Sequence, residues 1–144
     1  EIPEGEYIIP IGVADIKKTG KDVTIVSFGK IIKEAYKASE ILEKENIECE
    51  IIDLRTIRPM DYQTIFESVK KTNRLVILEE SWPFGNISTE ITYQVQSHIF
   101  DYLDAPIEKI NTADTPAPYS PTLLSEWLPN ADDVVKAIKK VLYI

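Results

Sequence analysis

The chain has 144 residues, ordinary apolar content and a formal net charge of -8, which together suit one compact acidic domain. The excess of acidic side chains opposes non-specific binding to nucleic-acid phosphates and favours contact with basic protein partners. Because Cys49 is the only cysteine and no apolar run reaches the roughly 18 residues of a membrane span, we expect a protein of the bacterial cytoplasm or an organelle matrix.

The first part of the chain is interpreted as a linker followed by a strand and a helix. Residues 1–13 carry prolines and turn residues of the sort that join domains, so we predict a linker there and one domain over residues 14–144. Residues 14–17 are a candidate edge strand. The β-branched run at 23–28 predicts a central strand, and apolar residues spaced by four, three and four over 31–42 predict a helix.

A second strand and helix follow around the sequence DLRTIRPMD. Residues 50–54 are rich in β-branched side chains and predict a buried strand. Pro59 interrupts any ladder or helix, and Asp61 is expected to cap a helix over 61–71. The apolar residues of that helix expected to face inward are Ile65, Phe66 and Val69.

The last part of the chain repeats the alternation. Residues 75–78 predict a third buried strand, an apolar stripe predicts a helix over 87–103, and residues 107–110 predict a further strand. Asn130 is expected to cap the final helix. Alternating strands and helices predict an α/β fold, a three-layer sandwich whose mostly parallel sheet has one antiparallel edge strand.

The proline-rich stretch at 111–129 has two interpretations. It is either a surface arm that packs on a partner or a loosely ordered connection. Its aromatic residues, Tyr119 and Trp127, favour packing.

The residues that carry catalytic chemistry are mostly absent from this sequence. His98, the only histidine, lies in a predicted helix and is interpreted as a surface or packing residue. Cys49 has acidic neighbours that discourage the thiolate, so we interpret it as structural. The glycines form neither a GxxxxGK[ST] nor a GxGxxG loop, which opposes nucleotide binding. From the residues alone we expect no catalytic, cofactor-binding or metal-binding site.

Two arginines follow the predicted strand at 50–54. The carboxyl edge of an open α/β sheet is where such folds usually bind ligands, so Arg55 and Arg58 are candidates for a functional role. The alternative is that they pin the loop through carboxylates and carbonyls. We favour loop-pinning.

Five segments together resemble the C-terminal domain of the pyruvate dehydrogenase beta subunit, a transketolase-like family. They are IPIGVADIKKTGKDVTIVSFG, ECEIIDLRTIRPMD, SVKKTNRLVILEE, FDYLDAPIEKI and LPNADDVVKAIKKVLYI. The resemblance implies an enzyme that uses thiamine diphosphate with Mg, bound outside this chain with the help of a missing N-terminal pyrimidine-binding domain. It also implies an α subunit and a second β subunit as partners.

The same resemblance implies that this domain assembles the complex and docks the subunit-binding domain of dihydrolipoyl acyltransferase. Asp104 and Ile144, with its terminal carboxylate, match the positions that meet basic side chains of that domain. Without the resemblance, Asp104 is equally well interpreted as a residue that caps or ends its helix. Arg55 matches the family's DLR motif, and in distant relatives a comparable arginine approaches the mouth of the active site.

The expected parent enzyme oxidatively decarboxylates pyruvate and transfers the acetyl group to lipoyl-lysine, while this domain alone is expected to be inactive. Beta subunits for branched-chain 2-oxo acids or acetoin are the alternatives within the family. A stand-alone acidic protein-binding module is the alternative of another class.

One turn departs from the family pattern. Beta subunits typically have a turn resembling GxPQxGxGxE after the third strand, whereas this chain has Ser81, Asn86 and Ser88 in place of glycines. Because Asn tolerates positive φ and Ser caps helices, the turn is expected to survive with an altered approach to a neighbouring subunit.

Overall fold

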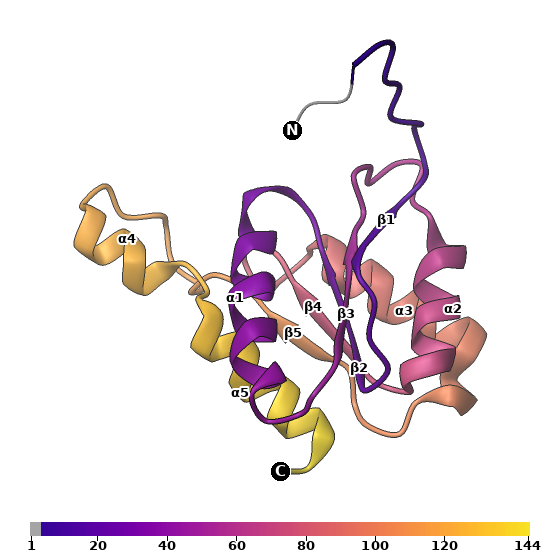
Figure 1. Ribbon diagram of the computed structural model, residues 1–144. Coiled ribbons are helices and arrows are strands. Elements are labelled where there is room, and N and C mark those ends of the chain that lie inside the picture. The colour runs from indigo at the N-terminus through magenta and orange to yellow at the C-terminus, as the bar shows by residue number, and fades with distance from the viewer. Residues whose placement is uncertain (1–3) are drawn as a thin grey trace.

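A five-stranded sheet forms the centre of the molecule in the computed structural model, which describes residues 4–144 (Figure 1). In sheet order the strands are β1, β3, β2, β4 and β5. Their bounds are β1 (Asp15–Lys18), β2 (Val23–Ser27), β3 (Cys49–Asp53), β4 (Leu75–Leu78) and β5 (Glu108–Ile110). The edge strand β1 is antiparallel to β3, and the other three pairings are parallel.

Helices cover both faces of this sheet. Helices α1 and α5 pack on one face, and α2 and α3 pack on the other (Figure 1). The helical segments are η1 (Gly29–Ile31), α1 (Ile32–Glu43), α2 (Tyr62–Thr72), α3 (Ile87–Ile99), η2 (Phe100–Tyr102), α4 (Pro121–Trp127) and α5 (Ala131–Leu142). The predicted three-layer α/β sandwich with one antiparallel edge strand is confirmed.

Two apolar clusters fill the space between the layers. One lies beneath α1 and α5 and contains the fully buried Ile25, Leu42 and Ile138. The other lies beneath α2 and α3 and contains Ile52 and Ile91. The central strands β2, β3 and β4 each contribute residues to both clusters, because successive side chains along a strand point to opposite faces. This explains why these three strands are largely apolar rather than alternating.

The predicted helix caps are confirmed. The Asp61 carboxylate accepts a hydrogen bond from the Thr64 N–H at 3.1 Å. Asn130 and Asp133 form a reciprocal capping box at the start of α5. Asn46 has a φ of +63° in the turn that follows α1. These polar residues set where the helices begin and end.

The structure corrects two predicted elements. The predicted helix over 87–103 ends at Ile99, whose backbone leaves helical geometry, and Leu103 packs on the core from outside any helix. The stretch at 111–129 is not loop throughout, because Pro121 occupies the first turn of the short helix α4. Proline is favoured there because its missing N–H has no intrahelical partner to lose.

Phe66 is half-buried and packs against the apolar cluster beneath α2 and α3, as predicted, and its ring lies between those of Tyr62 and His98. One predicted side-chain role is corrected. In the turn before α3, Gly85 adopts the positive φ of +65°, while Asn86 is extended and caps the helix by accepting from the Thr89 N–H. Asn86 therefore takes the capping role that was expected of serine.

Of the predicted linker, residues 1–3 lie outside the described residues, and residues 4–13 contain no helix or strand. This segment leaves the body of the molecule near the loop after β3 (Figure 1). Its inner end is held by a hydrogen bond from the Gly12 N–H to the Thr56 hydroxyl at 3.0 Å. Ile8 and Ile11 are more than 70% exposed. That residues 1–13 join two domains stays a prediction.

Candidate functional site

Arg55 and Arg58 lie at the carboxyl edge of the sheet, in the loop that follows β3. Arg55 adopts a φ of +56°, and its guanidinium Nη2 lies 2.6 Å from Asp15 Oδ2 on β1. Its backbone N–H donates to the Asp53 carboxylate at 3.1 Å. Lys17 and Arg55 outweigh the effect of burial and hold the pKa of Asp15 below its ordinary value. Arg55 thus ties the loop to the edge strand.

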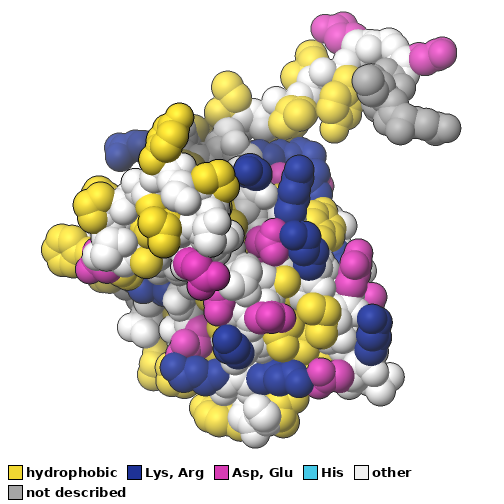
Figure 2. Space-filling model, turned by 90° about the vertical axis from the view of Figure 1, so that its left-hand side faces the viewer, with side chains coloured by type: hydrophobic (Ala, Val, Ile, Leu, Met, Phe, Trp, Pro, Cys, Tyr) yellow, Lys and Arg dark blue, Asp and Glu magenta, His cyan; other side chains and the backbone are white. Residues whose placement is uncertain are grey.

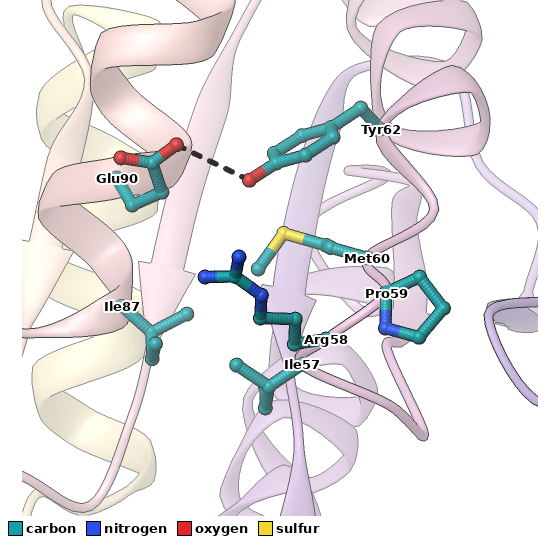
Figure 3. A pocket seen from close by; sticks show the side chains of 7 residues that line it. All are labelled: Ile57, Arg58, Pro59, Met60, Tyr62, Ile87 and Glu90. Atoms are coloured by element: carbon teal, nitrogen blue, oxygen red, sulfur yellow. Dashed lines mark hydrogen bonds between the residues drawn. The ribbon is translucent and has the colours of Figure 1, made fainter.

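Arg58 instead projects into a surface depression of about 760 Å³ between the loop and the start of α3 (Figure 3). The Tyr62 hydroxyl donates to Glu90 Oε1 at 3.3 Å across this depression. Burial, together with Glu90, raises the pKa of Tyr62. The side chains of Ile57 and Ile87 form apolar walls. A cation and a carboxylate beside apolar walls make a contact surface suited to another polypeptide.

The structure reveals a buried acid at this edge that sequence reasoning missed. Glu79 directly follows β4 and is fully buried. One of its oxygens accepts the Ser88 N–H at 2.8 Å and the other accepts the Ser81 hydroxyl. Glu79 therefore fixes the turn that carries Trp82 to the start of α3. The available signal was an acidic residue immediately after a buried strand.

Asp104 and Ile144 lie at the opposite end of the strands, near the start of β4. The Asp104 N–H donates to the Asn73 carbonyl at 2.9 Å, and the Tyr143 hydroxyl lies 3.4 Å from the Asp104 carbonyl. Since α3 ends at Ile99, Asp104 does not end that helix. The structure therefore brings the two residues implied by the resemblance to one end of the molecule, here called the docking end and defined by Asp104, Tyr143 and Ile144.

Arg74 also belongs to this region, and sequence reasoning missed it. Its Nε donates to the Val141 carbonyl at 3.0 Å, and its Nη2 lies 3.7 Å from Asp104 Oδ2. The Asp104 side chain is 59% exposed, so this ion pair is screened by water and contributes little stability by itself. Its geometric effect is to join α5 to the Asp104 segment.

The remaining candidates behave as structural residues. His98 is exposed, stacks on Phe66 with ring centroids 5.4 Å apart, and lies with Nδ1 2.9 Å from the Gln94 carbonyl. Cys49 is fully buried, and this burial raises the pKa of its thiol to about 11. The thiolate is therefore disfavoured by burial more than by the acidic neighbours noted in the sequence.

Across residues 4–144, no group of three or more His, Cys, Asp or Glu side chains is arranged to hold a metal ion. Within the same residues no helix has the length and apolar character needed to cross a membrane.

Known proteins resemble this chain over nearly its whole length. The beta subunit of the pyruvate dehydrogenase E1 component from Rickettsia felis is 49% identical over 99% of the chain, which covers 44% of that protein. The corresponding subunit from Rhizobium meliloti is 51% identical over 99% of the chain and 31% of the protein. The beta subunit of an acetoin:2,6-dichlorophenolindophenol oxidoreductase from Cupriavidus necator is 45% identical over 99% of the chain and 42% of the protein.

A solved structure and a family model agree with these relatives. The structure, described as a split gene transketolase in an inactive beta4 tetramer, has a TM-score of 0.83 and 28% identity, covering 94% of this chain and 44% of its own. The chain thus spans less than half the length of each of these proteins. The model for the transketolase C-terminal domain matches residues 12–134. The chain belongs to the transketolase C-terminal domain family, and the subunits it resembles include pyruvate dehydrogenase beta subunits.

Proposed function

We propose that this chain is the C-terminal assembly and docking domain of the beta subunit of a pyruvate dehydrogenase. The observation that carries the proposal is identity of about half to such subunits over almost the whole chain. The parent enzyme would oxidatively decarboxylate pyruvate and transfer the acetyl group to lipoyl-lysine of the acyltransferase. Thiamine diphosphate with Mg would supply the carbon–carbon bond cleavage from a site outside this chain, so the isolated domain would be inactive.

The docking role is assigned to the docking end. There the Asp104 and Ile144 side chains are both exposed, and the hydroxyl of Tyr143, which precedes Ile144, lies 3.4 Å from the Asp104 carbonyl. We infer that the Asp104 carboxylate and the Ile144 terminus receive basic side chains from the subunit-binding domain of dihydrolipoyl acyltransferase. The net charge of -8 supports this, because long-range attraction raises the rate at which a basic partner is encountered.

The assembly role is assigned to the arm, defined as residues 111–129 including α4. The arm stands away from the sheet, and apolar side chains gather on it and on the N-terminal segment (Figures 1 and 2). Tyr119 is fully exposed and Leu123 is 59% exposed. The Trp82 and Trp127 indoles both donate to the Thr115 carbonyl, at 3.0 and 2.9 Å, which gives the arm a defined base. We infer that an α subunit or a second β subunit covers it.

Substrate choice has a second candidate. The Cupriavidus necator relative acts on acetoin according to its name and is nearly as similar as the pyruvate dehydrogenase subunits. The edge that bears Arg55 and Arg58 faces the N-terminal segment, so we infer that contacts there orient a preceding domain rather than select the substrate.

The compartment would be bacterial cytoplasm or mitochondrial matrix, following the bacterial and mitochondrial relatives.

The proposal is tested with the full-length subunit assembled with its α partner. Titration calorimetry with the isolated subunit-binding domain is expected to show binding that Asp104→Ala and deletion of Ile144 weaken. A buried charged contact would lose about 2 to 5 kcal/mol, and a rim contact much less. Glu40→Ala removes one negative charge from the exposed surface of α1 and serves as the control.

Unchanged affinity in both docking-end variants would remove the docking assignment. Turnover of pyruvate, acetoin and branched-chain 2-oxo acids by the same assembled enzyme decides the substrate. Preference for acetoin would overturn the pyruvate assignment and leave the docking result unaffected.

A further inference from the structure

Arg74 lies between the two segments of the docking end and contacts both. It immediately precedes β4, and its side chain is 25% exposed, compared with 59% for Asp104. Its Nε donates to the Val141 carbonyl in the last turn of α5, at 3.0 Å. Its Nη2 lies 3.7 Å from Asp104 Oδ2. One half-buried side chain therefore joins two segments that are far apart in sequence.

We propose that Arg74 is a positioning residue for docking, which holds the Asp104 carboxylate and the final turn of α5 in one fixed arrangement. This inference rests on the proposed docking function. The planar guanidinium suits the task because its N–H groups point in several fixed directions, so it reaches a carbonyl and a carboxylate together. A lysine ammonium is a single point charge on a flexible stem and would hold one of the two segments at a time.

The backbone on each side is already ordered, and the side chain of Arg74 adds a direct link between the two segments. The Asp104 N–H is bound to the Asn73 carbonyl, and the Ile144 N–H is bound to the Lys139 carbonyl at 3.1 Å. The Tyr143 hydroxyl adds a longer contact of 3.4 Å to the Asp104 carbonyl. Preformed acceptors lower the ordering cost that a partner would otherwise meet on binding.

The ion pair with Arg74 leaves Asp104 able to accept a partner's hydrogen bond. At 3.7 Å the guanidinium is beyond hydrogen-bond distance from Oδ2, and the carboxylate is more than half exposed. The neighbouring cations of α5 are engaged elsewhere, since Lys139 pairs with Glu45 at 2.6 Å and Lys140 pairs with Glu108 at 2.8 Å. Among the described residues, Arg74 is the cation found within 4 Å of Asp104.

The test uses the full-length subunit assembled with its α partner and the isolated subunit-binding domain as the probe. Arg74→Met is expected to weaken binding roughly tenfold, which is the effect of misplacing one charged contact. Arg74→Lys keeps the charge and is expected to fall between Arg74→Met and the wild type. Lys139→Met is the matched control, because it removes a cation that ties α5 to the turn after α1 without touching Asp104.

A second measurement reports on position without the partner. Amide hydrogen exchange of the C-terminal peptide containing Tyr143 and Ile144 is expected to accelerate in Arg74→Met and to stay unchanged in Lys139→Met. Far-UV circular dichroism confirms that each variant is folded before it is compared.

The outcomes separate this inference from the proposed function. If the wild type binds the probe and Arg74→Met binds equally well or more tightly, the positioning role is overturned and docking stands. If exchange at the C-terminus is the same in Arg74→Met and wild type, the positioning role is likewise overturned. If the wild type does not bind the probe, the proposed docking function is wrong, and this inference is wrong as well.

Discussion

Glu79 provides the most demanding test of how this fold positions its carboxyl edge. Its side chain is fully buried, and both oxygens accept hydrogen bonds from the turn it supports, one of them from the Ser88 N–H at the start of α3. We expect Glu79→Ala to lower the free energy of unfolding by about 3 kcal/mol. Leaving the buried Ser88 N–H without a partner costs about 1 to 3 kcal/mol, and the cavity left by the side chain adds to this.

Glu79→Gln should be milder, at about 1 kcal/mol. The amide oxygen still accepts from the Ser88 N–H, and the Ser81 hydroxyl can reverse its role and accept from the amide NH₂. What is lost is the extra strength of a charged acceptor at a helix N-terminus.

Urea unfolding of the 144-residue chain, followed by circular dichroism, measures these differences. The control is Glu80→Ala, which removes the neighbouring acid from an exposed position and should stay within about 0.5 kcal/mol of the wild type. If Glu79→Ala were as stable as Glu80→Ala, the hydrogen bonds would not hold the turn, and the account of this edge would be wrong.

Three further predictions concern other parts of the fold. Burial acts to raise the pKa of Asp61, but hydrogen bonds from Thr64 and Ala14 outweigh it, so the folded pKa lies below the ordinary value of an aspartate. The Asp61 carboxylate therefore stabilises the fold at pH values above its unfolded pKa, and this contribution is lost as the pH falls through its folded pKa. The difference in unfolding free energy between wild type and Asp61→Asn, measured in urea, should accordingly shrink in acid. Gly20→Ala should cost about 1 to 3 kcal/mol or more in the same assay, because a Cβ there would lie 2.3 Å from the Cys49 carbonyl carbon; loss of less than about 0.5 kcal/mol would contradict this. The Cys49 thiol, with its pKa raised to about 11, should resist a thiol-reactive dye at pH 8 in the native chain and react at once in denaturant; equal rates in both would show that the thiol is accessible.

The sequence was sufficient for most of the fold because local pattern and global packing agree. The apolar spacing of the first and last helices and the β-branched strands predicts elements that the structure confirms within a few residues. The short α4 was missed because seven residues give too little periodicity to detect, although Pro121 marks its first turn.

The site residues were harder to predict because their roles depend on contacts between distant segments. Arg74 acts through Val141, which is 67 positions away in the chain. Glu79 is buried because the start of α3 supplies a donor for it, and nothing local indicates that a charged residue would be enclosed. Asp104 and Ile144 were identified by resemblance, and the contact of the neighbouring Tyr143 hydroxyl with the Asp104 carbonyl became apparent only in three dimensions.

The docking end lies at one end of the strands, and Arg55, Arg58 and Glu79 lie at the other, so the full length of the strands separates them. Among residues 4–144, the hydrogen bonds and ion pairs at the two ends of the strands share no partner, so the energetic effects of substitutions there should be independent of each other. Under the proposed docking function, mutations at the docking end would change the affinity for the acyltransferase domain without altering contacts made at the carboxyl ends of the strands. The two ends of the domain could then evolve separately.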